Sequence, residues 1–110
     1  LLISSTMRTG LMGYARTIAN DLARDGITVN NVAPGYTRTE RLDELAGHLS
    51  TTQKKSLDEV TAEWERTIPA QRLGRPEELA AVVTFLASER ASYVTGTTIA
   101  VDGGSVQSLY

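Results

Sequence analysis

The chain has 110 residues, no cysteine, one histidine, and 11 Lys and Arg against 13 Asp and Glu. The lack of cysteine excludes a disulfide scaffold, a cysteine nucleophile and a cysteine-ligated metal site, and His48 alone cannot form a multi-histidine site. A net charge of −2 gives no basis for binding nucleic acid or an anionic membrane, and no apolar run approaches the roughly 20 residues of a membrane helix. We therefore expect a globular cytoplasmic protein with no metal ion.

The sequence begins with Leu1-Leu2-Ile3, which is an apolar run without an initiator methionine. Natural termini are usually polar and loosely held. We therefore expect this sequence to be a piece of a longer chain.

The first third of the chain predicts a helix and then a strand. Apolar residues recur every three or four positions from residue 4 to 25, and Asp25-Gly26 ends the helix. Gly10 and Gly13 lie inside it and are expected to permit close approach of a neighbouring element. Residues 27–33 (ITVNNVA), ended by Pro34-Gly35, predict a strand buried on both faces, as in a parallel sheet. The expected buried face of the helix carries Met7, Leu11, Tyr14, Ala15, Ile18 and Leu22.

Two short helices are predicted next. The spacing from Thr37 to Glu40 is that of a capping box and could open the first helix, and residues 50–55 (STTQKK) predict a polar loop. Ser56 to Glu59 repeats the capping-box pattern before the second helix, which Pro69 ends. We expect these two helices to form an excursion and not core. Their apolar faces carry Leu42, Leu45 and Leu49, then Leu57, Val60, Trp64 and Ile68.

The last third predicts one more helix and one more strand. Pro76 fits the first position of a helix, and Glu77 and Glu78 are favourably placed in its first turn. Residues 97–101 (TTIAV) predict a strand, closed by residues 102–104 (DGG). The expected buried face of this helix carries Leu79, Val82, Val83 and Leu86.

The predicted order of elements is helix, strand, helical excursion, helix, strand. A strand, a crossover helix and a second strand form a βαβ unit, which is right-handed in nearly all cases. Two strands alone make a poor sheet, and both are expected to be buried on two faces. The sequence therefore predicts an α/β fold that is one end of a larger doubly wound parallel sheet.

Residues 27–35 (ITVNNVAPG) form the predicted strand with its Pro-Gly turn, and residues 72–80 (RLGRPEELA) lead into the last predicted helix. The first block resembles a strand and turn of the short-chain dehydrogenase/reductase family, and the second resembles the RLGxPEEIA segment of that family. Residues 85–88 (FLAS), 93–96 (YVTG) and 101–104 (VDGG) follow in the family's order. The resemblance covers nearly the whole chain, is weakest over residues 41–67, and is closest to the subgroup that includes 3-oxoacyl-carrier-protein reductases.

The resemblance implies that residues 1–110 are the C-terminal part of a single Rossmann-type domain whose nucleotide-binding half lies upstream. It implies NAD or NADP as cofactor and hydride transfer to or from a small-molecule alcohol or carbonyl substrate. The complete protein would be a homo-oligomer with no nucleic-acid or membrane partner, and the 110-residue piece alone would be inactive.

The resemblance also implies roles for residues that follow the first strand. Pro34 and Gly35 would lie beyond the carboxyl end of the strand, where open α/β sheets bind ligands. The backbone near Thr37 would face the nicotinamide amide, and Thr39 would hydrogen-bond the cofactor. Tyr36 would line or cover the substrate site. Residues 40–68 would form a lid whose closure excludes water.

The family's catalytic Tyr-x-x-x-Lys pair has no counterpart, because no tyrosine here has a lysine four residues later. Counting back from Pro34 without gaps places Ser4 at the tyrosine position and Arg8 at the lysine position. A serine hydroxyl is a far weaker acid than a tyrosine phenol, whose ordinary pKa is about 10. Arg8 keeps the positive charge but presents a planar fork instead of a point charge.

Three interpretations of this departure stay open. The protein transfers hydride with a relocated or substrate-assisted acid, with Ser4 and Arg8 as catalytic candidates. Alternatively, it keeps cofactor binding or oligomerisation without efficient chemistry, as an interaction or regulatory module. In the third interpretation, residues 3–5 (ISS) are the family's strand-end block and the active-site loop is deleted.

Overall fold

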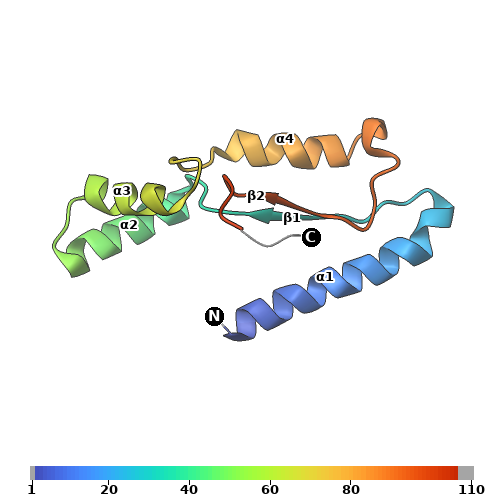
Figure 1. Ribbon diagram of the computed structural model, residues 1–110, viewed down its shortest axis with the longest axis horizontal. Helices are drawn as coiled ribbons and strands as arrows, with labels where there is room; N and C mark the ends of the chain where they lie inside the picture. The colour runs from blue at the N-terminus through green and yellow to red at the C-terminus, as the bar shows by residue number, and fades with distance from the viewer. Residues whose placement is uncertain (1, 107–110) are drawn as a thin grey trace. The chain divides into compact units, whose positions relative to one another are not determined.

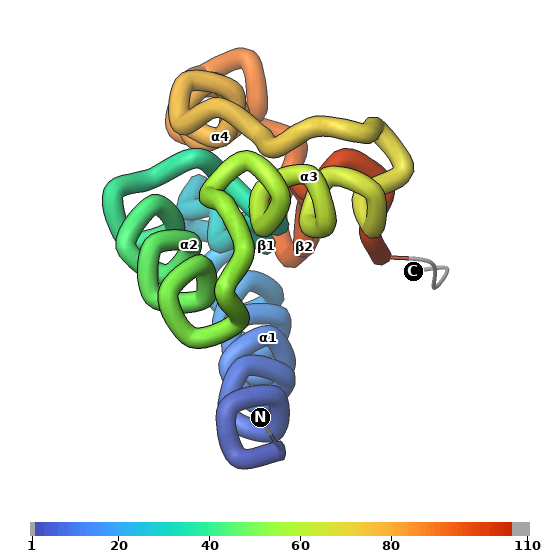
Figure 2. Tube along the Cα trace, turned by 90° about the vertical axis from the view of Figure 1, so that its left-hand side faces the viewer, coloured from blue at the N-terminus to red at the C-terminus, as the bar shows by residue number. Residues whose placement is uncertain are grey.

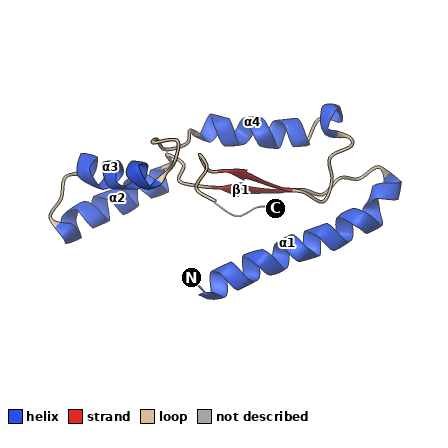
Figure 3. Ribbon diagram, in the orientation of Figure 1, coloured by secondary structure: helices blue, strands red, loops and turns tan. Residues whose placement is uncertain are grey.

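The computed structural model describes residues 2–106. Within these residues the chain forms four α-helices, two strands and two short 3-10 helices. Figures 1 and 3 show the helices and strands in chain order. The described residues fall into two compact units, residues 2–33 with 81–99 and residues 34–80 with 100–106. In chain order, the elements are α1 (Leu2–Leu22), β1 (Asn31–Pro34), α2 (Glu40–Gln53), α3 (Leu57–Thr67), α4 (Pro76–Leu86) and β2 (Thr98–Val101).

Helix α1 confirms the first predicted helix. One 3-10 turn (Ala23–Asp25) follows it, and Gly26 then takes a left-handed φ of 74°, a conformation that favours glycine. Residues 3–5 lie inside α1, where the Thr6 hydroxyl donates to the Leu2 carbonyl at 2.8 Å. The interpretation of residues 3–5 as a strand end is therefore wrong, because the backbone there is continuous helix.

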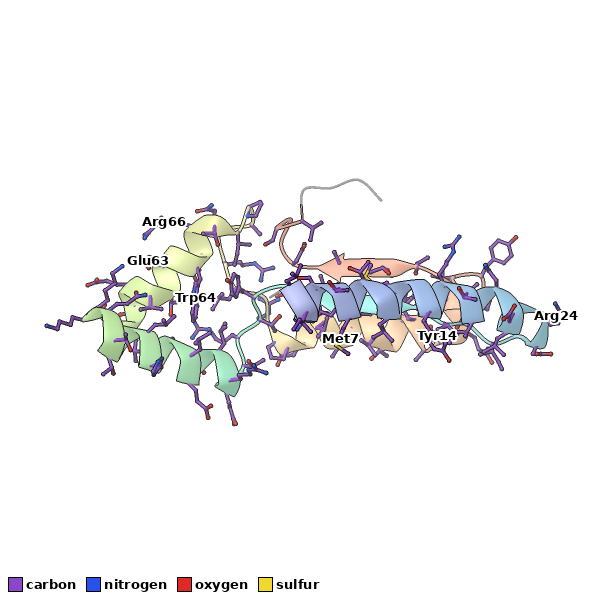
Figure 4. All side chains as sticks on the ribbon, turned by 90° about the horizontal axis from the view of Figure 1, so that it is seen from below. Met7, Tyr14, Arg24, Glu63, Trp64 and Arg66 are labelled. Atoms are coloured by element: carbon purple, nitrogen blue, oxygen red, sulfur yellow. The ribbon has the colours of Figure 1, made fainter. Side chains whose placement is uncertain are left out.

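The predicted burial of the α1 face is wrong for its first two thirds. Met7 is 71% exposed, and Leu11 and Tyr14 are exposed as well, whereas Ala15 and Ala19 are buried. Figure 4 shows Met7 and Tyr14 projecting from the helix. An ideal Cβ at Gly10 or Gly13 would meet no described atom within 4 Å, so the described residues do not make the expected close approach. The apolar periodicity thus identified the helix, but burial also needs a facing surface.

Strands β1 and β2 form a parallel pair. Asn31 donates its N–H to the Thr97 carbonyl at 2.8 Å, and Gly35 donates its N–H to the Val101 carbonyl at 3.0 Å. Both partners advance by four residues, so the two strands run in the same direction. In the first unit, α1 and the second half of α4 lie on opposite sides of these strands (Figure 1). The predicted burial of both strand faces is wrong, since most strand residues are half-buried and none is fully buried.

The first strand is shorter than residues 27–33. Before Asn31 the backbone pairs with a loop, because Val29 donates its N–H to the Thr95 hydroxyl at 3.0 Å and accepts from the Gly96 N–H at 2.8 Å. Asn30 holds the same loop: its side chain donates to the Val94 carbonyl at 3.0 Å and accepts from the Thr97 hydroxyl at 2.7 Å. The β-branched run is therefore extended, but only its end joins the ladder.

Helices α2 and α3 lie side by side in the second unit (Figure 2). The expected Thr37–Glu40 capping box does not form: Thr39 is the N-cap of α2, and its hydroxyl accepts the Leu42 N–H at 3.3 Å. The predicted loop at 50–55 is helical as far as Gln53, since Thr51 and Thr52 donate their hydroxyls to carbonyls one turn back. Lys54 ends the helix with a φ of 53°.

Helix α3 starts as predicted, with the Ser56 hydroxyl accepting the Glu59 N–H at 3.1 Å. The expectation that this region contributes no core is wrong, because Val60 and Ile68 are each 2% exposed and Ala46 of α2 is also buried. Helix α4 starts at Pro76 as predicted. Its expected buried face is wrong, because none of its residues is fully buried and Val83 is exposed.

Candidate functional site

The turn after β1 passes directly against the turn after β2. An ideal Cβ at Gly35 would lie 2.7 Å from Asp102 Cβ and 2.8 Å from Asp102 Cα. Ordinary carbon–carbon contacts are about 3.5–4.0 Å, so only a glycine fits at this position. The Pro34-Gly35 turn is therefore fixed in place by Asp102.

Asp102 in turn orders the glycine pair behind it. Its carboxylate accepts the N–H groups of Gly104 and Val106, each at 3.0 Å. Gly103 has a φ of +63°, and an ideal Cβ there would lie 2.8 Å from Ile68 Cγ2. Ala70 donates its N–H to the Gly103 carbonyl at 3.0 Å. The VDGG block thus connects the turn after β1 to the segment that follows α3.

A third segment holds the residues just after Gly35. Gly74 donates its N–H to the Tyr36 carbonyl and accepts the Arg38 N–H, each at 2.9 Å, which makes a parallel bridge between Thr37 and Gly74. In such a bridge the residues on either side of Thr37, namely Tyr36 and Arg38, make the hydrogen bonds to Gly74. The N–H and C=O of Thr37 itself therefore point away from Gly74. No backbone hydrogen bond to the Thr37 N–H is formed within the described residues. Thr37 therefore offers one donor and one acceptor side by side.

The Gly74 segment is anchored by an ion pair. The Arg72 guanidinium donates two hydrogen bonds to the Glu78 carboxylate, at 2.7 and 2.8 Å, and Glu78 also accepts the Arg75 N–H at 3.0 Å. The Arg72 hydrogen bonds first, and then the Arg75 N–H, lower the pKa of Glu78 to about 2. Because Glu78 lies in the first turn of α4, the helix start holds the loop that carries Gly74.

An aromatic pair covers the same segment. The ring of Tyr36 stacks on the indole of Trp64, with centroids 5.7 Å apart and planes inclined by 11°. Trp64 projects from α3 (Figure 4) and is half-buried, while Tyr36 remains 45% exposed. Offset or near-parallel aromatic pairs of this kind stabilise a fixed ring position.

A groove of about 520 Å³ lies along α2 and α3. Three carboxylates and one guanidinium line it together with small and apolar side chains, so it is polar and mainly acidic. Its lining residues are Arg38, Asp43, Ala46, Leu57, Asp58, Thr61, Ala62 and Glu65. No described group of three His, Asp or Glu residues could hold a metal ion, and no described helix meets the length and apolarity of a membrane span.

The structure gathers one set of the predicted site residues. Pro34, Gly35, Tyr36, Thr37 and Thr39 form a single supported segment of the second unit. The Thr39 hydroxyl is used as an N-cap acceptor, which leaves its O–H as a donor.

Ser4 and Arg8 belong to the first unit. They lie four residues apart, on one face of the first turns of α1, and both are exposed. Their assignment to the family's catalytic positions stays a prediction.

Sequence reasoning missed the residues that support the site. Gly74, Trp64 and the Arg72–Glu78 pair act through contacts between distant segments. The one local signal was a glutamate three residues after Arg75, which is the spacing of a carboxylate that reaches back to a helix start.

Comparison with known proteins gives consistent relatives. A family model described as enoyl-(acyl carrier protein) reductase matches residues 3–106. The chain is 40% identical over 100 residues to the short-chain reductase protein NovJ of Streptomyces niveus, and this match covers 91% of this chain and 37% of NovJ. It is 43% identical over 98 residues to the 3-oxoacyl-(acyl-carrier-protein) reductase MabA of Mycobacterium bovis, and this match covers 88% of this chain and 35% of MabA.

Solved structures agree with the fold. YwfH, an NADPH-dependent reductase involved in bacilysin biosynthesis, superposes with a TM-score of 0.86 at 37% identity, over 96% of this chain and 40% of YwfH. L-sorbose reductase from Gluconobacter frateurii, complexed with NADPH and L-sorbose, gives a TM-score of 0.87 at 31% identity. This match covers 94% of this chain and 40% of the reductase. The chain thus spans less than half the length of the proteins it matches. It has the α/β architecture of part of a Rossmann-type fold, and it belongs to the short-chain dehydrogenase/reductase family.

Proposed function

We propose that the complete protein carrying this chain is an NAD(P)-dependent oxidoreductase that transfers hydride between a nicotinamide cofactor and a small alcohol or carbonyl compound. The observation that carries this proposal is the geometry of Thr37, whose N–H and C=O point away from Gly74 at the carboxyl end of β1. A primary amide such as that of nicotinamide requires one acceptor and one donor, and Thr37 supplies both. Ligands of open α/β sheets bind at this end of the strands.

The residues present fit such a cofactor. Gly35 has no side chain, Thr37 presents backbone polar groups, and the Thr39 O–H is available as a donor. The bound cofactor supplies the hydride. In this proposal, residues 1–110 are the C-terminal part of a single domain, and residues 40–68 form the lid over the substrate, with Tyr36 at the border of the substrate site.

Ser4 and Arg8 have proposed roles on α1. Arg8 would hold ribose hydroxyls or a phosphate with its guanidinium fork. Ser4 would occupy the position of the family's acid. Its hydroxyl holds its proton far more tightly than a phenol does, so Ser4 would orient the substrate oxygen while a different group delivers the proton.

The relatives bear on the substrate. MabA and the FabG protein of Aquifex aeolicus are named 3-oxoacyl-(acyl-carrier-protein) reductases, and L-sorbose reductase acts on a ketose. Each name describes reduction of a ketone carbonyl. We therefore propose a ketone, including the 3-oxoacyl thioester class, as the substrate in the reducing direction.

A second candidate function is favoured by the exposed apolar residues of α1. A protein in which Ser4 replaces the phenol and Met7, Leu11 and Tyr14 are exposed could serve in self-association or in regulation after losing efficient chemistry. In this alternative, the complete protein keeps the fold and forms a homo-oligomer.

The test uses the complete protein that contains this chain. Oxidation of NADH and NADPH is followed by absorbance with a panel of ketones and 3-oxoacyl thioesters, and cofactor binding by nucleotide fluorescence. We expect turnover in the panel and weaker binding in Arg8→Ala. No turnover with nucleotide binding intact would contradict the oxidoreductase proposal, and a stable oligomer without nucleotide affinity would favour the second candidate.

A paired substitution tests the assignment of Ser4 and Arg8. Ser4→Tyr together with Arg8→Lys rebuilds the family's pair on one helical face, so kcat should rise while the KM for substrate changes little. Ser4→Phe together with Arg8→Lys is the matched control, because it adds the ring and the lysine without the acid. Equal rates for the double variant and the Phe control would remove Ser4 from the acid position.

A further inference from the structure

Tyr36 is held from two directions. Its backbone carbonyl accepts the Gly74 N–H at 2.9 Å, and its ring stacks on Trp64 at 5.7 Å between centroids. The first contact belongs to the bridge that orients Thr37, and the second belongs to α3 of the lid. Tyr36 is therefore the residue at which the lid and the proposed cofactor segment meet.

The position of Trp64 is fixed by its own helix. Val60, Trp64 and Ile68 are spaced four residues apart, and the outer two are each 2% exposed. Beyond the helix, Ile68 packs against Gly103 of the turn that also supports Gly35. The indole is thus presented to Tyr36 by a helix that is packed at both ends of this stretch.

The exposure of Tyr36 shows that the stack leaves part of its surface available. The side chain is 45% exposed although one side of its ring lies against Trp64. In contrast, Tyr93 has no stacking partner among the described residues and is fully exposed. The stack therefore fixes the Tyr36 ring without burying it, which suits a surface that contacts a bound molecule.

We propose that Trp64 is a positioning residue for the substrate: its indole fixes the Tyr36 ring, which borders the substrate beside Thr37. This inference rests on the proposed oxidoreductase function. Without the indole, the substrate must order the ring when it binds, which raises the KM for substrate. The bridge from Gly74 to Thr37 does not involve the indole, so cofactor affinity stays unchanged.

The test compares Trp64→Ala with Trp64→Phe in the complete protein. We expect Trp64→Ala to raise the KM for the ketone by about two- to twelve-fold, the range that aromatic pairs are worth. The Kd for the reduced nucleotide should stay within about two-fold of wild type in both variants. Trp64→Phe keeps a stacked ring and should recover most of the lost affinity. Tyr93→Leu is the matched control, because it removes an unstacked ring and should change neither constant.

A general structural role predicts a different pattern. If the cofactor Kd rises together with KM in Trp64→Ala, or if Trp64→Phe is as impaired as Trp64→Ala, the proposal is overturned. Should Trp64→Ala fail to fold, Tyr36→Leu removes the stack from the other side and must raise the same KM with the same unchanged cofactor Kd. The KM of the double variant Trp64→Ala with Tyr36→Leu must be no higher than that of the poorer single variant, since both substitutions remove the same interaction.

The stack can also be tested independently of the proposed function. The emission of Trp64 is obtained as the difference between the spectra of wild type and Trp64→Phe, and it should change in Tyr36→Leu but not in Tyr93→Leu. Absence of turnover with any ketone defeats the proposed function. An unchanged Trp64 emission in Tyr36→Leu defeats the present inference.

Discussion

Gly35→Ala provides the sharpest test of how the site is built. The added Cβ would lie 2.7 Å from Asp102 Cβ and 2.8 Å from Asp102 Cα, about 1 Å closer than carbon atoms normally approach. Both atoms belong to or adjoin the backbone of a turn that is hydrogen-bonded through Gly104 and Val106, so rotation of a side chain cannot relieve the overlap. Overpacking of this kind costs about 1–3 kcal/mol.

The expected result is a lower melting temperature and weaker cofactor binding. For a domain of 150–250 residues, about 1–3 kcal/mol corresponds to a fall in Tm of about 2–12 °C. Because the turn must move, the proposed contact at Thr37 moves with it, and the Kd for reduced nucleotide should rise as well. Thermal unfolding followed by circular dichroism and a nucleotide fluorescence titration measure the two effects.

Gly47→Ala is the matched control for this substitution. Gly47 lies inside α2, and an ideal Cβ there meets no described atom within 4 Å. Alanine in a helix interior is favoured over glycine by about 0.5–1 kcal/mol, so this variant should be as stable as wild type or more stable. A Gly35→Ala protein with an unchanged Tm and nucleotide Kd would refute the assignment of Asp102 as the support of the turn.

Three further variants test individual contacts. Glu78→Gln should be less stable than wild type, with the full difference present above pH about 4.5 and lost as the pH falls to about 2. The reason is that the paired carboxylate, whose pKa is lowered in the folded state, stabilises the protein only while it is ionised. Melting temperatures of both proteins at several pH values measure this difference. Ser56→Ala removes the N-cap of α3 and should cost about 1 kcal/mol, seen as faster amide exchange in the first turn of that helix. Asn30→Ala leaves the Val94 carbonyl and the Thr97 N–H without their partner and should cost about 1–3 kcal/mol in denaturant unfolding, whereas an unchanged midpoint would show that water replaces the amide.

Features that depend on neighbouring residues in the sequence were predictable. The Ser56 cap, the Pro76 helix start and the Gly26 stop each rest on contacts within one turn of the chain, and all three are confirmed. The residue types that make such contacts stand next to one another in the sequence, so their pattern can be recognised there. The element order followed from these boundaries.

Features decided by competition or by distant partners were not predictable. Thr37 and Thr39 both fit a helix start, and Thr39 is the cap because Gly74 holds Thr37 in an extended bridge. The strand could not be placed at Asn31 from its β-branched run, because the loop around Thr95 takes the earlier backbone groups. Burial of Met7 on α1 failed for a related reason, since periodicity gives a face but not the surface opposite it.

The candidate site shows the same division. The segment from Pro34 to Thr39 was found through its resemblance to a family, whereas the partners that hold it were found only in the structure. Gly74 and Trp64 lie at least 25 residues from it along the chain, and no local pattern joins them to it. Their roles depend on a crossover that returns the chain beside β1.

The family-like blocks around the site have one physical explanation. The PG turn passes against Asp102, the glycine pair of VDGG packs on Ile68, and Gly74 of the RLG block bonds on both sides of Thr37. Each glycine lies where another backbone or side chain approaches, or where φ is positive. The three blocks are therefore parts of one packed junction, and this junction sets the position of the Thr37 backbone. A change in any block should thus displace Thr37 and weaken the nucleotide binding proposed for it, and a change at Gly103 should also disturb Ile68 at the end of α3.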